Sequence, residues 1–145
     1  MRKKRRQIDM PASYVLEHLD EAIEKKWCRV YYQPIVRTIS GKLCAMEALA
    51  RWDDPYWSFL TPPFFIAILE QHKLIHKLNS FLIEEICRNM ARMRAAGQPM
   101  VAVSINLSRL DFVQEDLIFF KSSRMLCAST MCRGTCCIWR LSRIS

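Results

Sequence analysis

The stretch from residue 30 to residue 52, VYYQPIVRTISGKLCAMEALARW, constrains the fold more than any other part of the chain. Its two ends show the alternation typical of strands, in which every second side chain lies on the same face. Between them, the segment TISGK places Gly41 where a positive φ angle costs little. The stretch therefore predicts an antiparallel β-hairpin near the start of the fold.

The two faces of the second predicted strand differ in chemical character. One face is apolar throughout, as expected beneath helices, and consists of Cys44, Met46, Ala48, Ala50 and Trp52. The other face carries Glu47 and Arg51, about 13 Å apart along the strand at roughly 3.3 Å per residue. An acid and a base on one face can form a structural ion pair or belong to a ligand site. In the first strand, Gln33 shares a face with Tyr31 and Ile35.

One helix is predicted before the hairpin, and two helices and a third strand are predicted after it. Apolar residues at helical spacing predict an amphipathic helix over residues 11–26. A short helix is predicted from Phe64 to about Gln71, and a longer one ends before Gly97. These helices supply the apolar surface that the first face of the second strand requires.

Alternation over residues 100–107 predicts the third strand. Its small and polar side includes Ser104 and Asn106 and is expected to point the same way as Glu47. An asparagine at the end of a strand is compatible with a turn-forming role as well as with a site. The residues alone leave both possibilities open.

Four motifs in order give the chain a resemblance to a known family. They are YQPI at 32–35, EALARW at 47–52, LTP at 60–62 and SINLS at 104–108. Together they resemble the EAL domain family, the bacterial phosphodiesterases that hydrolyse cyclic di-GMP to linear pGpG. The resemblance covers residues 13–120, with the motifs at spacing similar to that of the family.

The resemblance implies an α/β fold, a partial (β/α)8 TIM-like barrel of EAL type with an initial antiparallel hairpin. It implies that Glu47 and Asn106 are metal ligands for Mg2+ or Mn2+, which prefer oxygen ligands. It also implies that Arg51 contacts a phosphate of cyclic di-GMP and that Gln33 and Leu49 belong to the nucleotide surface. All five would lie at one mouth of the barrel, where such folds place their active sites.

The chain departs from the family after the third strand. A complete barrel of this type takes about 250 residues, whereas this chain has 145. The later ligand glutamates, the paired aspartates, the lysine and the glutamine-glycine-tyrosine segment of the family are not found. We therefore predict a basic segment at 1–10, a truncated EAL domain at 11–120 and an irregular tail at 121–145. The cysteine- and arginine-rich composition of the tail resembles translation in a wrong reading frame.

Two functions follow as expectations from this partial resemblance. The first is a cyclic di-GMP phosphodiesterase domain in truncated form with negligible activity, since one glutamate and one asparagine cannot position two metal ions. The alternative is a non-catalytic module that binds the nucleotide or a partner in cyclic di-GMP signalling. An uncovered edge beyond the third strand predicts marginal stability and pairing in a homo-oligomer or with another signalling protein.

The placement of charged residues and cysteines limits which partners the protein is expected to bind and in which cellular compartment it is expected to lie. The formal net charge of +8 comes from the two ends, because residues 11–120 hold twelve basic and thirteen acidic residues. This distribution argues against a nucleic-acid-binding surface. No apolar run is long enough to predict a transmembrane segment, and no apolar stretch follows the basic start as a secretory signal requires. Single cysteines at 28, 44 and 87 within apolar patterns predict reduced core residues and a cytoplasmic location.

Overall fold

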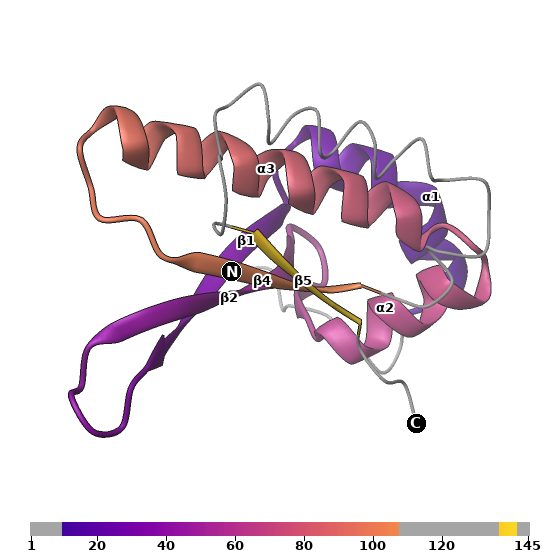
Figure 1. Ribbon diagram of the computed structural model, residues 1–145. Coiled ribbons are helices and arrows are strands. Elements are labelled where there is room, and N and C mark those ends of the chain that lie inside the picture. Colours follow the sequence, from indigo (N-terminus) through magenta and orange to yellow (C-terminus); the bar gives the residue numbers. More distant parts are fainter. Residues whose placement is uncertain (1–9, 108–136, 142–145) are drawn as a thin grey trace.

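The computed structural model describes residues 10–107 and 137–141 (Figure 1). In chain order the elements are α1 (Ala12–Glu24), β1 (Cys28–Val36), β2 (Leu43–Asp54), β3 (Ser58–Leu60), α2 (Pro62–Gln71), α3 (Ile75–Ala95), β4 (Ala102–Leu107) and β5 (Cys137–Leu141). The strands form one sheet in the order β1-β2-β4-β5, with β3 paired to the end of β2. The three helices lie together on one side of this sheet (Figure 1).

The predicted hairpin is confirmed, because β1 and β2 pair in antiparallel orientation. Gly41 closes the turn with a φ angle of 64°, and the Arg37 amide donates to the Lys42 carbonyl across it at 2.9 Å. A side chain at Gly41 would meet no atom within 4 Å, so backbone conformation and not space favours glycine there. Pro34 lies within β1, which is compatible with the position of β1 at the edge of the sheet.

The apolar face of β2 is buried toward its second half. Ala48, Ala50 and Trp52 are buried under the helices, and the Trp52 ring lies 5.8 Å from that of Phe65 in α2. Cys44 and Met46 are only partly buried, so the expectation of a buried face along the whole strand is wrong at its start. The reason is visible in Figure 1, where the tip of the hairpin extends beyond the helices.

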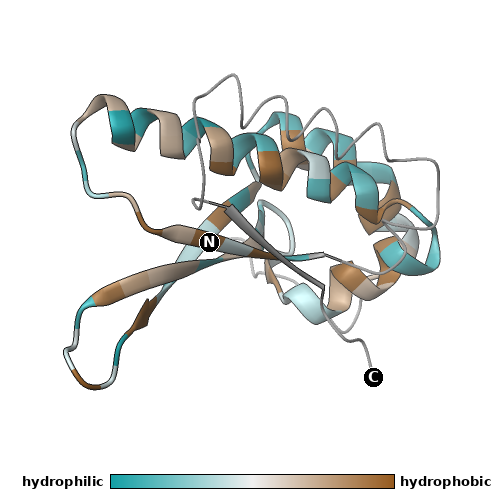
Figure 2. Cartoon of the chain, in the orientation of Figure 1, coloured by the Kyte–Doolittle hydropathy of each residue, from teal (hydrophilic) through white to brown (hydrophobic). Residues whose placement is uncertain are grey.

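Each helix contributes buried apolar residues to the core, and Figure 2 shows that hydrophobic and hydrophilic residues are interspersed along the helical ribbons. α2 begins at Pro62, two residues earlier than predicted, because proline lacks only a hydrogen bond that the first helical turn does not make. α3 ends as predicted before Gly97, which has a φ angle of 65°. The amides of Gly97 and Gln98 donate to the carbonyls of Arg94 and Met93, closing the helix in a Schellman motif.

One strand lies inside the segment predicted to be an irregular tail. Cys137–Leu141 forms β5 and pairs in parallel with β4, with Asn106 opposite Arg140. The prediction of an irregular tail is therefore wrong for these five residues, and β4 is not an edge strand. Sequence alternation could not reveal so short a strand, since its formation depends on pairing with a strand about thirty residues earlier. The rest of the tail and residues 1–9 of the predicted basic segment at 1–10 lie outside the described residues.

No helix among the described residues is both long enough and apolar enough to span a lipid bilayer.

Candidate functional site

The side of the sheet opposite the helices carries the polar residues that the sequence singles out. We call it the open face, defined by side chains from three neighbouring strands: Tyr31, Gln33, Glu47, Leu49, Arg51, Ser104 and Asn106. Strand pairing places these side chains in rows. Gln33 is opposite Glu47, Tyr31 is opposite Leu49, and Ser104 is the β4 partner of Glu47.

The two predicted metal ligands are in direct contact. The amide nitrogen of Asn106 donates to Oε1 of Glu47 at 2.6 Å, across the boundary between β4 and β2. The contact arises because Glu47 is in register with Ser104, so that Asn106 lies one step along the same face. Glu47 is half-buried and Asn106 is exposed, so both remain accessible.

Arg51 is free of carboxylate partners among the described residues, whose ion pairs join other side chains. The alternative that Glu47 and Arg51 form a structural ion pair is therefore wrong. The Arg51 guanidinium instead donates to the carbonyl of Ala50 at 2.7 Å and lies over the Tyr31 ring, 5.9 Å from its centroid. A guanidinium held by a carbonyl and a ring keeps its positive charge available for an anion.

The other two predicted nucleotide residues complete the same surface. Gln33 is exposed and directly across from Glu47, while Leu49 lies between Glu47 and Arg51 on β2. The structure thus brings all five predicted site residues onto one contiguous face. Their roles toward metal and nucleotide stay predictions.

A small cavity of about 150 Å³ adjoins the end of this face. Arg51 and Asn106 line it together with Glu70 of α2 and Asn79 of α3, and its remaining lining is mainly apolar. Asn79 is buried, with 3% of its surface exposed. A cavity of this volume is too small to enclose a dinucleotide.

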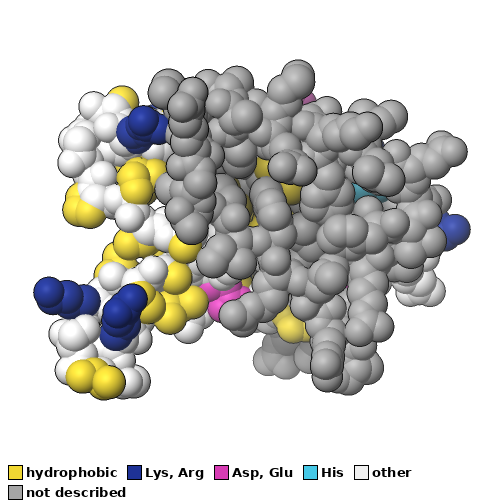
Figure 3. Space-filling model, in the orientation of Figure 1, with side chains coloured by type: hydrophobic (Ala, Val, Ile, Leu, Met, Phe, Trp, Pro, Cys, Tyr) yellow, Lys and Arg dark blue, Asp and Glu magenta, His cyan; other side chains and the backbone are white. Residues whose placement is uncertain are grey.

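The hairpin end of the sheet exposes hydrophobic side chains. Figure 3 shows such side chains gathered over the hairpin, with Lys and Arg side chains close to them. The exposed apolar residues of this region are Tyr31, Ile35, Val36, Ile39 and Leu43. An uncovered apolar surface next to polar site residues is typical of an interaction site.

The described residues offer the kind of oxygen ligands that a divalent cation prefers, but too few of them for a complete metal site. A carboxylate and an amide oxygen are ligands that Mg2+ and Mn2+ prefer, and rotation of the Asn106 amide would present its oxygen beside Glu47. Nowhere in the described ranges do three His, Cys, Asp or Glu side chains come together as a metal cluster. Glu47 and Asn106 would therefore supply two of the ligands that a divalent cation requires, which is too few for a complete site.

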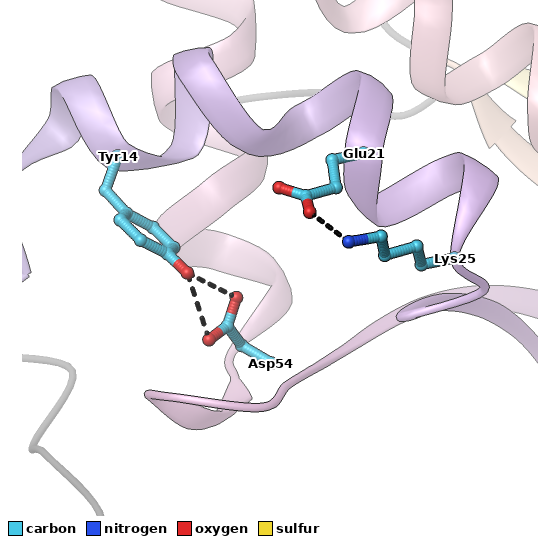
Figure 4. Close-up of polar contacts among 4 residues, drawn as sticks. All are labelled: Tyr14, Glu21, Lys25 and Asp54. Carbon is cyan, nitrogen blue, oxygen red and sulfur yellow. Dashed lines mark hydrogen bonds and ion pairs between the residues drawn. The ribbon is translucent and has the colours of Figure 1, made fainter.

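A second polar cluster lies on the helix side of the sheet and was not anticipated from the sequence. Asp54, 2% exposed, accepts a hydrogen bond from the Tyr14 hydroxyl at 3.1 Å (Figure 4). The same carboxylate accepts from the amides of Tyr56 and Trp57 at 2.8 and 2.9 Å. Burial first, and then the Asp54 charge, raise the pKa of Tyr14 well above its usual value. These contacts tie α1 to the turn after β2, so the cluster is structural.

Tyr31, like Ser104, is a residue of the open face to which sequence reasoning gave no role. The alternation placed it on the same face as Gln33, and that was the available signal. Its contact with Arg51 could not be inferred, because it depends on the register of the hairpin.

The family model and the relatives that match this chain point to the same family. The family model described as "EAL domain" matches residues 16–130, most of the chain. The oxygen sensor protein DosP of Escherichia coli is 36% identical over 99 residues, which are 68% of this chain and 12% of DosP. The bifunctional diguanylate cyclase/cyclic di-GMP phosphodiesterase MucR of Pseudomonas aeruginosa is 31% identical over 104 residues, 72% of this chain and 15% of MucR.

Solved structures agree with these relatives. The structure of the PaMucR phosphodiesterase in complex with c-di-GMP superposes with a TM-score of 0.76 at 28% identity. The alignment covers 87% of this chain and 50% of that one. The FimX EAL domain of Xanthomonas citri, in complex with c-diGMP, has a TM-score of 0.72 at 20% identity, covering 88% and 48% of the two chains, which shows the shared fold. The chain spans about half of these solved chains and a much smaller share of the curated relatives.

Proposed function

This chain belongs to the EAL domain family, and on that premise we propose that it is part of a cyclic di-GMP phosphodiesterase domain. In this proposal the described strands and helices are one portion of a (β/α)8 barrel, and the open face is part of its interior. The observation that supports it is the contact of Asn106 with Glu47 on the same face as Gln33, Leu49 and Arg51. Independent strands thereby deliver all five residues to one surface.

Arg51 is proposed to bind a phosphate of cyclic di-GMP. Its guanidinium has two hydrogen-bonding edges suited to phosphate oxygens, and no carboxylate of the described residues neutralises it. The side-chain amide of Gln33 can both donate and accept hydrogen bonds, and Leu49 offers an apolar contact for a base or ribose. These properties match a ligand that combines charged phosphates with flat, hydrogen-bonding bases.

Glu47 and Asn106 are proposed to hold Mg2+ or Mn2+. Such an ion, when bound, would polarise a phosphate oxygen and lower the pKa of a bound water. No three His, Cys, Asp or Glu side chains come together among the described residues, and a two-metal hydrolysis requires more ligands than Glu47 and Asn106. We therefore propose that the chain, as these 145 residues, binds cyclic di-GMP without appreciable hydrolysis.

The experiment measures binding and turnover on the same purified chain. Calorimetry with cyclic di-GMP should detect binding that Arg51→Ala weakens about tenfold to a hundredfold, the loss expected of a charge-assisted bidentate contact. Arg29→Ala is the matched control, since Arg29 is the strand partner of Arg51 but donates its Nε to the Lys26 carbonyl at 3.1 Å. Its loss should leave the affinity unchanged.

Turnover is followed by chromatography of the nucleotide after incubation with Mg2+ or Mn2+. We expect no linear pGpG above the background of Glu47→Ala. Formation of pGpG at a rate that Glu47→Ala abolishes would show that these residues suffice for catalysis and would overturn the proposed inactivity. Absence of binding would overturn the nucleotide site.

A non-catalytic interaction module is the second candidate function. It is favoured by the exposed hydrophobic side chains at the hairpin and by the position of β1 at the edge of the sheet. An edge strand with exposed apolar neighbours can pair with a second copy or with another signalling protein. Light scattering of the purified chain tests this, and a dimer that Ile35→Lys dissociates while cyclic di-GMP does not bind would favour it.

A further inference from the structure

Tyr31 is a large aromatic side chain that the fold leaves on the open face. It is 55% exposed, whereas its neighbour Tyr32, on the opposite face of β1, is partly buried against the core. Its strand partner is Leu49, so its ring lies in the row next to that of Gln33 and Glu47. No helix of the described fold covers this side of the sheet (Figure 1).

The register of the hairpin explains why Arg51 approaches this ring. The direct partner of Arg51 is Arg29, and two like charges in opposite positions repel each other. Arg29 turns toward the end of α1, where its Nε donates to the Lys26 carbonyl. Arg51 extends the other way along the diagonal, which long side chains can span, and its guanidinium carbon lies 5.9 Å from the centre of the Tyr31 ring.

The guanidinium is therefore fixed from two sides. The Ala50 carbonyl accepts one of its hydrogen bonds, and the ring face of Tyr31 attracts the cation without accepting a hydrogen bond from its other N–H groups. A carboxylate in the place of this ring would neutralise the charge and compete with an anionic ligand. A ring orients the charge without occupying its remaining donors, which pre-organises it for an anion.

We propose that Tyr31 is a positioning residue, whose ring holds the Arg51 guanidinium on the open face in the orientation that receives a phosphate of the nucleotide. This inference rests on the proposed nucleotide site and adds a residue outside the five predicted from the sequence. Tyr31 acts through Arg51. The phenolic hydroxyl has no part in it, because the cation is attracted by the ring.

The test combines a binding measurement with a double-mutant cycle. Tyr31→Leu removes the ring and should weaken cyclic di-GMP binding about threefold to fivefold, the usual worth of an exposed cation-π contact, whereas Tyr31→Phe should leave the affinity within about twofold. In an Arg51→Ala background, Tyr31→Leu should have no further effect. Tyr56→Leu is the matched control, because Tyr56 is 56% exposed and lies outside the open face.

A second readout needs no nucleotide. In the NMR spectrum of the free chain, the ring current of Tyr31 should shift the Arg51 side-chain resonances upfield, and Tyr31→Leu but not Tyr31→Phe should abolish this shift. Absence of the shift in the wild-type chain overturns the inference. An equal loss of affinity on Tyr31→Leu with and without Arg51 also overturns it, because Tyr31 would then contact the nucleotide directly. If the wild-type chain binds no cyclic di-GMP, the proposed function fails, and the NMR readout alone decides whether Tyr31 holds Arg51.

Discussion

Trp52 and Arg51 are neighbours in β2 and belong to two different regions of the molecule. Trp52 points under the helices and is fully buried, whereas Arg51 points to the open face and is only partly buried. The same contrast separates Ala48 from Glu47 and Ala50 from Leu49. Alternation along one strand therefore separates the residues that stabilise the fold from those proposed to bind a ligand, and substitutions on the open face should be structurally inexpensive.

The largest expected effect lies on the helix side. Trp52→Ala should lower the free energy of unfolding by about 3 to 5 kcal/mol, because it removes a large buried side chain that contacts Phe65. Arg51→Ala, one residue away, should cost less than about 1 kcal/mol. Urea denaturation followed by circular dichroism measures both. Similar losses for the two variants would contradict the division between the faces.

Asp54 sharpens the comparison, since it is a polar residue on the buried side. Asp54→Ala should cost about 2 to 4 kcal/mol, because the Tyr14 hydroxyl and two turn amides lose their acceptor. Tyr14→Phe removes one of these bonds and should cost about 1 kcal/mol. Asp53→Ala is the control, since the adjacent Asp53 is exposed. Thermal unfolding of the three variants ranks them, and an equal effect of Asp53→Ala would contradict the structural role of Asp54.

The two regions also differ in how far the sequence predicts them. The apolar alternation of β2 from Ala48 to Trp52, the turn at Gly41 and the end of α3 at Gly97 are local patterns, and the structure confirms each. The set of open-face residues follows from the same alternation combined with the family motifs. Local patterns suffice there because each strand orients its own side chains.

The sequence did not predict features that form only when one segment pairs with or contacts another. β3 has three residues, too few for alternation to show, and it forms by pairing with the end of β2. β5 requires the edge of β4, and the Asp54 cluster requires α1 to reach the turn after β2. The contact of Arg51 with Tyr31 depends on the register of two strands, which a sequence pattern does not fix.

Cys28 makes the stability of the buried side depend on pH. Burial raises the pKa of its thiol from 9.0 to about 12. The unfolded chain therefore releases this proton at lower pH than the folded one, so the associated stability is complete below pH 9 and is lost as the pH rises toward 12. At pH 10 the wild-type chain should lose about 1 kcal/mol relative to pH 8 that Cys28→Ala does not lose. Urea titrations at both pH values measure this, and an equal pH dependence in the two proteins would contradict it.

The smallest expected change in the free energy of unfolding follows from removing the contact between Asn106 and Glu47 in the proposed site. Asn106→Ala removes a hydrogen bond between two accessible side chains, so it should change the free energy of unfolding by less than about 0.5 kcal/mol. Ser104→Ala is the matched control, because Ser104 is the strand partner of Glu47 and its hydroxyl donates a long hydrogen bond of 3.4 Å to the Met46 carbonyl. Thermal unfolding should not separate either variant from the wild type, whereas Mn2+ titration followed by water-proton relaxation should separate Asn106→Ala from Ser104→Ala. A loss of stability for Asn106→Ala comparable with that of Asp54→Ala would instead make the Asn106 contact part of the structural framework, and the open face would no longer be the region free of such constraints.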